Sequence, residues 1–395
     1  MIFKYIHDDN SKEIINLDLN VETTDEWMHI KSKSKLEFIK EFLPAFVSGQ
    51  KLVLFDSNHK QLLKFYQEND LNSFDSIQEV NKNAQVLFFT SGSSGFPVGA
   101  FKSRRNIEEE VEVLKALVQK YKIKKVVVTV PFVHIYGVLA GLLLPLSLGD
   151  IELVVKDDFL PYELLQEASD GETLVITTPV FIKALARLSE EKSLKSDLFI
   201  CSTGPLNVDD ITLFEEKYQT DVMQLFGSTE TGGIAYKFSS WVSWTALDSV
   251  DISTKDDKLS VTSAFISPYI LNKTISKLAQ PFVSEDIIEV KDNTFTLIGR
   301  SNKIIKIAGK RISALQIEAI IESIDGVQKA IVELVYKKEL LRSEQIVITI
   351  EAKEKIAKKV IKEKISQCFG VLTIPFSVKY VDKINYSAMG KKIIF

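Results

Sequence analysis

A run of small residues with hydroxyl groups follows the apolar segment Val86–Phe89: Thr90, Ser91, Gly92, Ser93, Ser94 and Gly95. Glycine permits positive φ and close backbone approach, so successive N–H groups can turn inward around an anion. The hydroxyls add donors that suit phosphate oxygens. A Ser/Gly linker has the same composition, but a linker rarely lies between a buried strand and a Pro-containing turn that leads into a helix. The run therefore predicts a phosphate-binding loop.

The residues after Gly95 exclude two common kinds of phosphate loop. No Lys-Ser/Thr pair follows, so this is no Walker loop, and no Gly-x-Gly-x-x-Gly fingerprint is present. Positions 90–99 instead resemble the loop of the AMP-forming adenylating enzymes, which include acyl-CoA synthetases, luciferases and peptide-synthetase adenylation domains. The family's lysine is replaced by Val98. One hypothesis is that Lys102, three residues beyond Gly99, supplies the missing charge.

The segment Pro131–Gly137 follows the β-branched run Val126–Val130 and contains His134. A lone histidine among apolar residues is usually a core residue. Its His-x-Tyr-Gly pattern nevertheless resembles the second motif of the adenylating family, an aromatic gate beside the acyl pocket. Amino-acid-activating members place an aspartate near this motif, and residues 131–149 have none. The resemblance therefore implies a carboxylic acid substrate without a charged amine.

Two further motifs follow expected strands. Ser202, Thr203, Gly204 and Pro205 resemble the family segment that lies along the adenine ring. The second motif, Phe226, Gly227, Ser228, Thr229 and Glu230, resembles the family's aromatic-Gly-x-Thr-Glu motif. The resemblance implies that its aromatic ring stacks on adenine, its threonine contacts the α-phosphate and its carboxylate holds Mg²⁺, a hard cation. Without the resemblance, Thr-Glu could equally be a helix N-cap.

The family's ribose and hinge motifs resemble residues 283–313. Asp286 corresponds to the aspartate that binds both ribose hydroxyls, and Glu285 is the alternative. Arg300 would reach the ribose, and Lys306 belongs to the same nucleotide-binding segment. Asn302 stands at the family's hinge, about which the small domain rotates after adenylation. A basic β-hairpin with no ligand would have a similar composition.

The last motif lies at residues 387–393 and resembles the family's Gly-Lys motif. Its lysine enters the active site during adenylation. Lys391 is the expected catalytic lysine, and Lys392 is the alternative. Read without the resemblance, a terminal Lys-Lys pair is a solvated tail.

Strand-like and helix-like segments alternate between residues 86 and 225, which predicts an α/β fold with a mostly parallel sheet. The motifs would then lie at the carboxyl ends of the strands, where ligands bind in such sheets. We expect a large N-terminal α/β domain over residues 1–301, shortened at its N-terminus relative to the family, and a small, mobile C-terminal α+β domain over residues 302–395. Ser313–Gln316 predicts a capping box that opens a helix in the small domain.

The bulk composition is that of a globular protein: 395 residues, 45% hydrophobic, with a net charge of −4. This charge predicts no nucleic-acid partner, although residues 302–395 carry 18 Lys and Arg against 10 Asp and Glu. Two cysteines favour a reducing, cytoplasmic setting, and the four scattered histidines show no metal-ligand spacing.

No signal peptide is visible, since MIFKYIHDDN becomes acidic before any long apolar run. Val126–Gly149 has no charged side chain and is long enough to span a bilayer. Pro131, His134, Tyr136 and Pro145 interrupt it, so a strand, a loop and a buried helix are expected instead of a membrane span.

Taken together, the resemblance covers residues 86–392 and implies activation of a fatty, hydroxy or aryl acid by MgATP. The acyl-AMP would then pass to coenzyme A or an acyl carrier protein as a thioester. The flanking segments Gly99–Ser103 and Thr129–Gly137 resemble short ligases associated with type II fatty-acid or aryl polyene synthesis. A monomer or homodimer is expected. Two alternatives remain: a non-catalytic nucleotide or acyl-adenylate binder, and an adenylating enzyme that forms no thioester.

Overall fold

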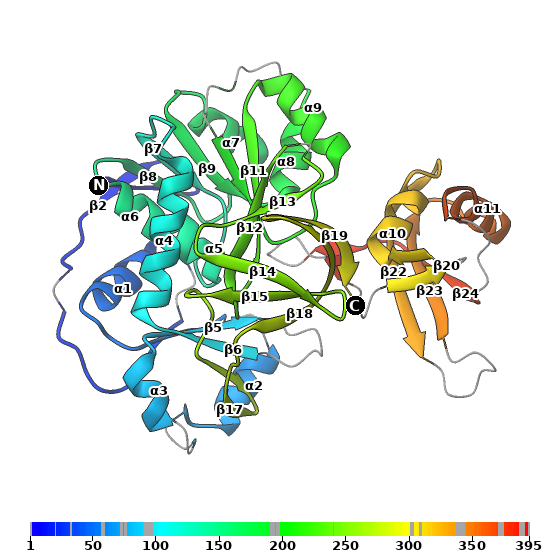
Figure 1. The fold of residues 1–395 in the computed structure, drawn as a ribbon. Coiled ribbons are helices and arrows are strands. Elements are labelled where there is room, and N and C mark those ends of the chain that lie inside the picture. The colour runs from blue at the N-terminus through cyan, green and yellow to red at the C-terminus, as the bar shows by residue number, and fades with distance from the viewer. Residues whose placement is uncertain are drawn as a thin grey trace. The chain divides into compact units, whose positions relative to one another are not determined.

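The computed structural model describes the chain in two compact units (Figure 1). The first consists of Met1–Asp251 with Val261–Phe282, and the second of Ile252–Ser260 with Val283–Phe395. The description omits residues 1, 20, 32–33, 57–59, 72–73, 75–76, 91–97, 190–193, 195–197, 240, 301–303, 308–309, 337–343, 370–374, 387–391 and 394–395. The expected domain boundary at residues 301 and 302 stays a prediction.

The large sheet of the first unit has a parallel centre, as the alternation of strands and helices predicts. Its strand order is β13-β12-β11-β10-β9-β7-β8-β1-β2. The strands are β1 (Ile2–Ile6), β2 (Lys12–Ile15), β7 (Lys125–Val128), β8 (Glu152–Val155), β9 (Thr173–Thr177), β10 (Leu198–Cys201), β11 (Asp221–Ser228), β12 (Gly232–Phe238) and β13 (Trp244–Ala246). Pairing is parallel from β1 through β8, β7, β9 and β10 to β11, and antiparallel from β11 to β13 and between β1 and β2. The α/β prediction is confirmed.

Helices cover both faces of this sheet because its central strands are apolar on both sides. Val126 and Val128 of β7 join a core cluster with residues of α1 and α4, whereas Val127 joins a second cluster with residues of α7, α8 and α9. The helices are α1 (Lys35–Val47), α4 (Arg104–Val118), α7 (Pro161–Glu167), α8 (Pro179–Ala186) and α9 (Val208–Tyr218). The sheet thereby holds the ends of its strands at fixed positions.

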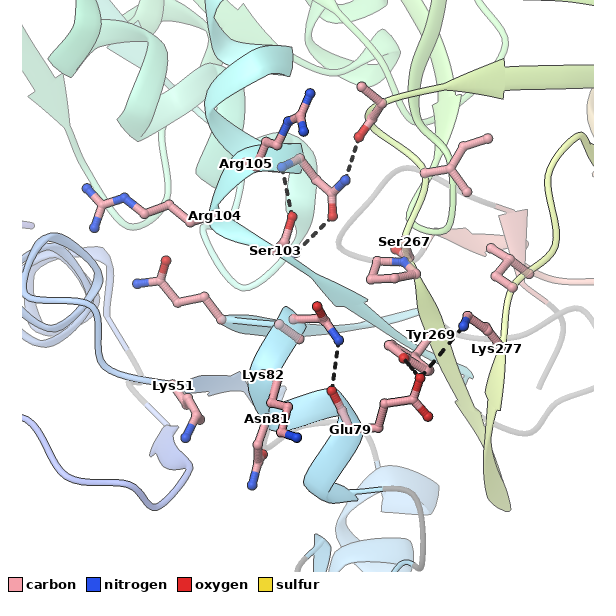
Figure 2. A pocket seen from close by; sticks show the side chains of 18 of the residues that line it. Lys51, Glu79, Asn81, Lys82, Ser103, Arg104, Arg105, Ser267, Tyr269 and Lys277 are labelled. Carbon is pink, nitrogen blue, oxygen red and sulfur yellow. Dashed lines mark hydrogen bonds and ion pairs between the residues drawn. The ribbon is translucent and has the colours of Figure 1, made fainter.

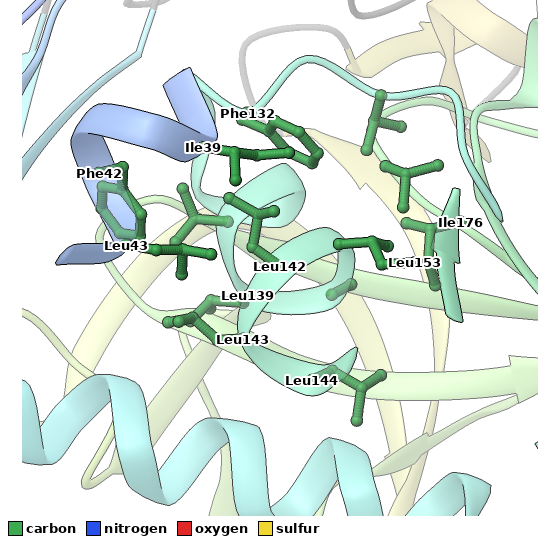
Figure 3. Close-up of a cluster of buried hydrophobic side chains, with 14 of the residues drawn as sticks. Ile39, Phe42, Leu43, Phe132, Leu139, Leu142, Leu143, Leu144, Leu153 and Ile176 are labelled. Carbon is green, nitrogen blue, oxygen red and sulfur yellow. The ribbon is translucent and has the colours of Figure 1, made fainter. Parts of the chain in front are cut away.

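The charge-free segment 126–149 forms a strand, a loop and a buried helix, as expected. After β7, the chain continues through α5 (Ile135–Val138), a π-helical turn η2 (Leu139–Leu143) and α6 (Leu144–Leu148). Figure 3 shows how Leu139, Leu142 and Leu143 pack with Ile39 and Phe42 of α1. No helix among the residues that the structure describes is long and apolar enough to cross a membrane.

A second sheet in the same unit carries both ends of the predicted phosphate loop. Its order is β17-β16-β6-β5-β4-β3. The strands are β3 (Met28–Ile30), β4 (Leu52–Leu54), β5 (Val86–Thr90), β6 (Val98–Lys102), β16 (Tyr269–Asn272) and β17 (Thr274–Lys277), with helices α2 (Lys60–Glu68) and α3 (Ile77–Asn83). The phosphate loop therefore joins two antiparallel strands, and β6 lies between the loop and α4. The helix expected after the loop is present as α4, but the strand β6 that precedes it was not expected.

The second unit has its own apolar core, built from α10, α11 and the sheet β22-β23-β24. Its elements are β18 (Phe282–Lys291), β19 (Thr294–Arg300), β20 (Ile304–Ile307), β21 (Lys310–Ser313), α10 (Ala314–Glu322), β22 (Val327–Tyr336), β23 (Glu344–Ala352), α11 (Lys358–Phe369), β24 (Phe376–Val381), β25 (Asn385–Tyr386) and β26 (Lys392–Ile393). The chain passes between the units within β14 (Val250–Lys255), within β15 (Lys258–Ser263) and at the start of β18. The Ser313 capping box is confirmed, since Ser313 Oγ accepts from Gln316 N and Gln316 Oε1 accepts from Ser313 N.

A buried lysine fixes the carboxyl ends of β7 and β8. Lys35, in the first turn of α1, is 7% exposed. Its Nζ donates to the carbonyl oxygens of Val128 at 3.3 Å, Thr129 at 3.1 Å and Lys156 at 2.7 Å. Burial lowers the pKa of Lys35 to about 8, although nearby Asp157 opposes this shift. The amine therefore joins α1 to the edge of the sheet at which the motifs lie.

Replacing this amine tests that role. Lys35→Met leaves three carbonyls without their donor, so we expect the free energy of unfolding to fall by about 2 kcal/mol. Between pH 8 and 10.5 the unfolded lysine holds its proton more tightly than the folded one. The unfolding free energy of the wild type should therefore rise with pH over this window, relative to the variant. Denaturant titrations at several pH values measure both effects, with Lys40→Met on the exposed face of α1 as the control. Equal unfolding free energies for Lys35→Met and Lys40→Met at every pH would contradict this role.

Candidate active site

The structure places the two ends of the predicted phosphate loop opposite one another. Thr90, the last residue of β5, pairs with Val98, the first residue of β6. The intervening Ser91, Gly92, Ser93, Ser94 and Gly95 lie outside the described residues. Their role in binding phosphate stays a prediction.

Lys102 does not lie beside this loop. In the β5–β6 pairing, Lys102 is opposite Val86, whereas Val98 is opposite Thr90. Four residues of strand separate positions 98 and 102, about 13 Å at the usual rise. The side chain is 1% exposed, and its Nζ donates to the carbonyl oxygens of Glu230 at 3.2 Å and Phe265 at 2.5 Å. The hypothesis that Lys102 replaces the loop lysine does not fit this position.

Thr229 and Glu230 lie in the turn of a β-hairpin. β11 ends at Ser228 and β12 begins at Gly232, so the helix N-cap alternative is wrong for this segment. Ser228 Oγ and Thr231 Oγ1 are 3.0 Å apart, and each accepts from the other residue's backbone N–H. Thr231 is buried, whereas the side chains of Thr229 and Glu230 are partly exposed. The turn thus presents one hydroxyl and one carboxylate to solvent or to a ligand.

The predicted adenine-binding residues lie at the carboxyl ends of neighbouring strands. Cys201 of β10 pairs with Gln224 of β11, and Ser202 Oγ donates to Leu225 O at 2.9 Å. Thr203 adopts φ of 82°, a left-handed conformation that is rare for a β-branched residue, and such strain is concentrated at functional sites. The hydrogen bond from Ser202 to Leu225 O brings the segment Ser202–Pro205 close to the end of β11.

The aromatic residue of the Thr-Glu motif packs on a tryptophan. The ring centroids of Phe226 and Trp244 are 5.4 Å apart, with the planes tilted by 48°. The β11–β12 pairing is irregular between Phe226 and Gly227, and such a bulge turns the strand locally. A Cβ at Gly227 would clash with Gly232 O, so this close approach of the two strands requires glycine.

His134 and its neighbours lie over the same edge of the sheet. His134 precedes α5, and its side chain is partly buried. Tyr136 Oη lies 3.2 Å from Thr177 O and 2.9 Å from Ile200 O, which are in β9 and β10. Within the first unit, the structure therefore brings together His134, Ser202–Pro205 and the turn after Phe226.

In the second unit, the two candidates for the ribose carboxylate have different surroundings. Asp286 lies opposite Arg300 in the β18–β19 pairing, with Arg300 Nε 3.7 Å from its Oδ1 and Ser284 Oγ 3.0 Å from its Oδ2. Burial raises the pKa of Asp286, and Arg300 opposes this shift. Glu285 is exposed and bonds to Lys258 at 2.9 and 3.0 Å. Successive strand residues face opposite sides, so the two carboxylates cannot share one role.

Lys392 has a structural role. Its Nζ donates to Glu318 Oε2 at 3.0 Å, Glu322 Oε1 at 2.6 Å and Ala330 O at 2.8 Å. These contacts join β26 to α10 and β22. Lys391, and the side chain of Lys306, lie outside the described residues. Lys391 thus remains the candidate catalytic lysine.

The donor set suits Mg²⁺ only with help from a ligand. No group of three His, Cys, Asp or Glu side chains that could hold a metal occurs among the described residues. Glu230 would supply one carboxylate oxygen, and Mg²⁺ commonly combines one or two carboxylates with substrate phosphates and water. The residues present therefore fit a magnesium ion that arrives with a nucleotide.

A pocket of the first unit lies elsewhere. It has a volume of about 840 Å³ and is lined by the end of α3, the residues before β5 and the start of α4, including Glu79, Gln85, Ser103 and Lys277 (Figure 2). Ser103 follows β6 and Gln85 precedes β5, so this pocket is at the end of the β5–β6 hairpin opposite the phosphate loop. No predicted site residue lines it.

Sequence reasoning missed two residues that support the site, Trp244 and Glu110, whereas Tyr136 belongs to the predicted His-x-Tyr-Gly motif. A signal for Glu110 was present, since it lies among Ile107, Val111 and Leu114 on the apolar face of α4. Its Oε1 accepts from Gly233 N at 2.7 Å. No pattern in the sequence marks Trp244, because its contact with Phe226 depends on the pairing of distant strands.

The structural role of Lys392 is testable by itself. Lys392→Met leaves two carboxylates of α10 partly buried without their partner, so we expect a loss of roughly 3 kcal/mol in unfolding free energy. Lys359→Met removes an exposed lysine of α11 that pairs with Glu363 and should change stability by less than about 1 kcal/mol. Denaturant unfolding compares the two. A Lys392→Met loss no larger than that of Lys359→Met would contradict the role.

The comparisons with known proteins agree with this fold. The AMP-binding enzyme family matches residues 29–264. The chain is 24% identical over 255 residues to 4-coumarate–CoA ligase of Cereibacter sphaeroides. The aligned residues cover 64% of this chain and 57% of that protein. It is 22% identical over 372 residues to a putative long chain fatty acid–CoA ligase of Staphylococcus aureus, and this alignment covers 84% of this chain and 78% of that protein. The chain thus spans little more than half the length of the first relative.

A solved structure shows the same fold. O-succinylbenzoate coenzyme A synthetase of Bacillus subtilis, in complex with ATP and magnesium ion, matches with a TM-score of 0.74 and 14% sequence identity, over 99% of this chain and 95% of that one. Because the family pattern covers more than half of the sequence, the chain belongs to the AMP-binding enzyme family.

Proposed function

We propose that this protein activates a carboxylic acid with ATP, giving acyl-AMP and pyrophosphate, and then transfers the acyl group to a thiol. The observation that carries the proposal is the turn of Thr229 and Glu230, which lies beside Phe226 and Ser202–Pro205 at the carboxyl ends of β10 and β11. Ligands bind at this edge in parallel sheets. The two relatives named as CoA ligases support the thioester product.

Each group of the nucleotide has its own proposed contacts, assigned from the motifs. Phe226 and the segment Ser202–Pro205 would contact adenine, Asp286 and Arg300 the ribose, and the loop Thr90–Gly95 the phosphates. A partly buried carboxylate that faces an arginine and a serine suits a diol, because it accepts from both hydroxyls. Lys306, in β20, would make a further contact with the nucleotide. The synthetase with bound ATP and magnesium supports ATP as the nucleotide.

The first step joins two anions, so charge stabilisation and positioning should provide most of the catalysis. The substrate carboxylate attacks the α-phosphorus of ATP, a carboxyl O–P bond forms, and the bond to pyrophosphate breaks. Lys391 would lie between the carboxylate and the phosphate, and Thr229 would donate to the α-phosphate. Glu230 would bind magnesium, which neutralises phosphate charge when bound. In the second step a thiolate attacks the acyl carbon and AMP leaves.

The substrate would be an acid without a charged amine, because residues 131–149 contain no aspartate to pair with one. The relatives' names support aryl or fatty acids. Coenzyme A or an acyl carrier protein would accept the acyl group. The excess of lysine and arginine in residues 302–395 favours an acceptor that carries negative charge.

Carboxylate-dependent exchange of pyrophosphate into ATP tests the function. The wild type, assayed with a panel of fatty, hydroxy and aryl acids, should exchange with at least one. Lys391→Ala should slow exchange by roughly 100-fold or more, because it removes a charge at the reacting phosphate. It should spare thioester formation from supplied acyl-AMP, and Lys359→Ala should match the wild type. Absence of exchange with every acid would favour a non-catalytic binder, and full exchange in Lys391→Ala would exclude that lysine.

The ribose assignment has a matched pair of variants. Asp286→Ala should weaken AMP binding about tenfold, the size of a lost hydrogen bond to a charged group. Glu285→Ala should change the affinity by less than about twofold, because its carboxylate pairs with Lys258 and surface pairs contribute little. Isothermal titration calorimetry with AMP measures both. A larger effect of Glu285→Ala would reverse the assignment.

A further inference from the structure

Two oppositely charged side chains are buried behind the turn of Thr229 and Glu230. Lys102, at the end of β6, is 1% exposed, and Glu110, in α4, is 5% exposed. Burial lowers the pKa of Lys102 and raises the pKa of Glu110, and the charge of each side chain opposes the shift of the other. Burying a charge is costly unless it is paired and hydrogen-bonded. Their partners therefore indicate what the two side chains do.

Lys102 holds the backbone of the turn from one side. Its Nζ donates to the carbonyl oxygen of Glu230 at 3.2 Å, and the same oxygen accepts from Ser267 N at 2.8 Å. The amine also donates to Phe265 O, in the segment that precedes Ser267. The peptide that follows Glu230 is thus fixed by two donors from two different parts of the chain.

Glu110 holds the chain directly after the turn. Its Oε1 accepts from Gly233 N at 2.7 Å. A Cβ at Gly232, which adopts φ of 72°, would clash with Glu110 Oε2, and a Cβ at Gly233 would lie 3.2 Å from Oε1. Two consecutive glycines therefore allow the carboxylate to lie against the backbone. With Lys102, it fixes the turn at residues 230 and 233.

Fold stability alone does not account for this pair. Burying a charge costs desolvation free energy, and apolar side chains of similar size often give equal or greater stability. The charged groups restrict the geometry of the turn, because each of their hydrogen bonds requires the backbone partner at one position. Positioning is valuable at this turn, since a displacement of about 1 Å can reduce catalysis roughly 100-fold.

We propose that Lys102 and Glu110 are positioning residues that fix the Thr229–Gly233 turn, so that the Thr229 hydroxyl and the Glu230 carboxylate are preorganised for MgATP. The MgATP part rests on the proposed function, whereas fixation of the turn does not. Lys102 thus contributes to nucleotide binding through the turn and not through the phosphate loop.

The decisive variant is the double substitution Lys102→Met with Glu110→Gln, which leaves no unpaired buried charge. We expect its melting temperature to remain within a few degrees of the wild type. We expect its Kd for MgATP, by isothermal titration calorimetry, to rise about tenfold, and the ratio of the affinities with Mg²⁺ and with EDTA to fall. Glu110→Gln alone should have the smaller effect, because the amide oxygen still accepts from Gly233 N.

Matched controls separate positioning from loss of charge. Lys125→Met removes another buried lysine. Lys125 pairs with Asp170 and is the first residue of β7, whereas Lys102 is the last residue of β6. Glu109→Gln removes the neighbouring carboxylate of α4, which pairs with Arg105 at the surface. Both should keep the wild-type Kd for MgATP. A folded double variant with wild-type Kd and wild-type Mg²⁺ dependence would overturn the proposal.

Hydrogen exchange keeps the test independent of the proposed function. Mass spectrometry of the free protein should show faster amide exchange in a peptide that covers residues 228–233 of the double variant, and unchanged exchange in β9 (Thr173–Thr177). If the wild type binds no MgATP, the proposed function fails, but this result still decides whether the pair fixes the turn. Unchanged protection of residues 228–233 would contradict fixation.

Discussion

The burial of β7 on both faces is the constraint on which the rest of the structure depends. Val126, Val127 and Val128 have no exposed surface, and alternate side chains enter different core clusters. A strand that is apolar on both sides must be covered on both sides, which requires helical connections between parallel strands. All the strand ends then meet at one edge. The candidate residues of the first sheet lie there because the apolar pattern leaves them no other position.

Buried amines hold this edge in place. Lys35 joins α1 to the ends of β7 and β8, and Lys102 joins β6 to the turn after β11. Each amine donates to carbonyl oxygens at strand ends or turns, and backbone groups buried without partners are costly. In the second unit, Lys392 has a similar function between β26 and α10. Lys35 and Lys102 therefore organise the backbone at this edge of the first unit, whereas Lys392 does so within the second unit.

Local patterns in the sequence predicted most elements of the first unit. The β-branched run Thr173–Thr177 predicts a strand and forms β9 with the same bounds. The apolar face of residues 105–121 predicts a helix, which is α4 (Arg104–Val118), and the run Asp221–Leu225 predicts the strand that forms β11. β6 was missed, because Gly99 and Ala100 have low strand propensity and only pairing with β5 and β16 makes them extended. The end of β11 was placed three residues too early, since a bulge lets the strand continue to Ser228.

The site was predictable as motifs but not as geometry. Resemblance identified the Thr229–Glu230 pair, yet only the register of β5 and β6 shows that Lys102 is remote from Thr90. Sequence distance from Gly99 was misleading, because a strand carries the chain away from the loop. The choice between Asp286 and Glu285 likewise depended on which face of β18 each side chain occupies.

Oxygen labelling tests the central claim most directly. A carboxylic acid that supports exchange is prepared with ¹⁸O in both carboxyl oxygens and incubated with the protein, MgATP and hydroxylamine as the acceptor. Attack of the carboxylate on the α-phosphorus, followed by loss of AMP, predicts one ¹⁸O atom in AMP by mass spectrometry. Label in inorganic phosphate with release of ADP, or unlabelled AMP, would contradict acyl-adenylate formation by this chain.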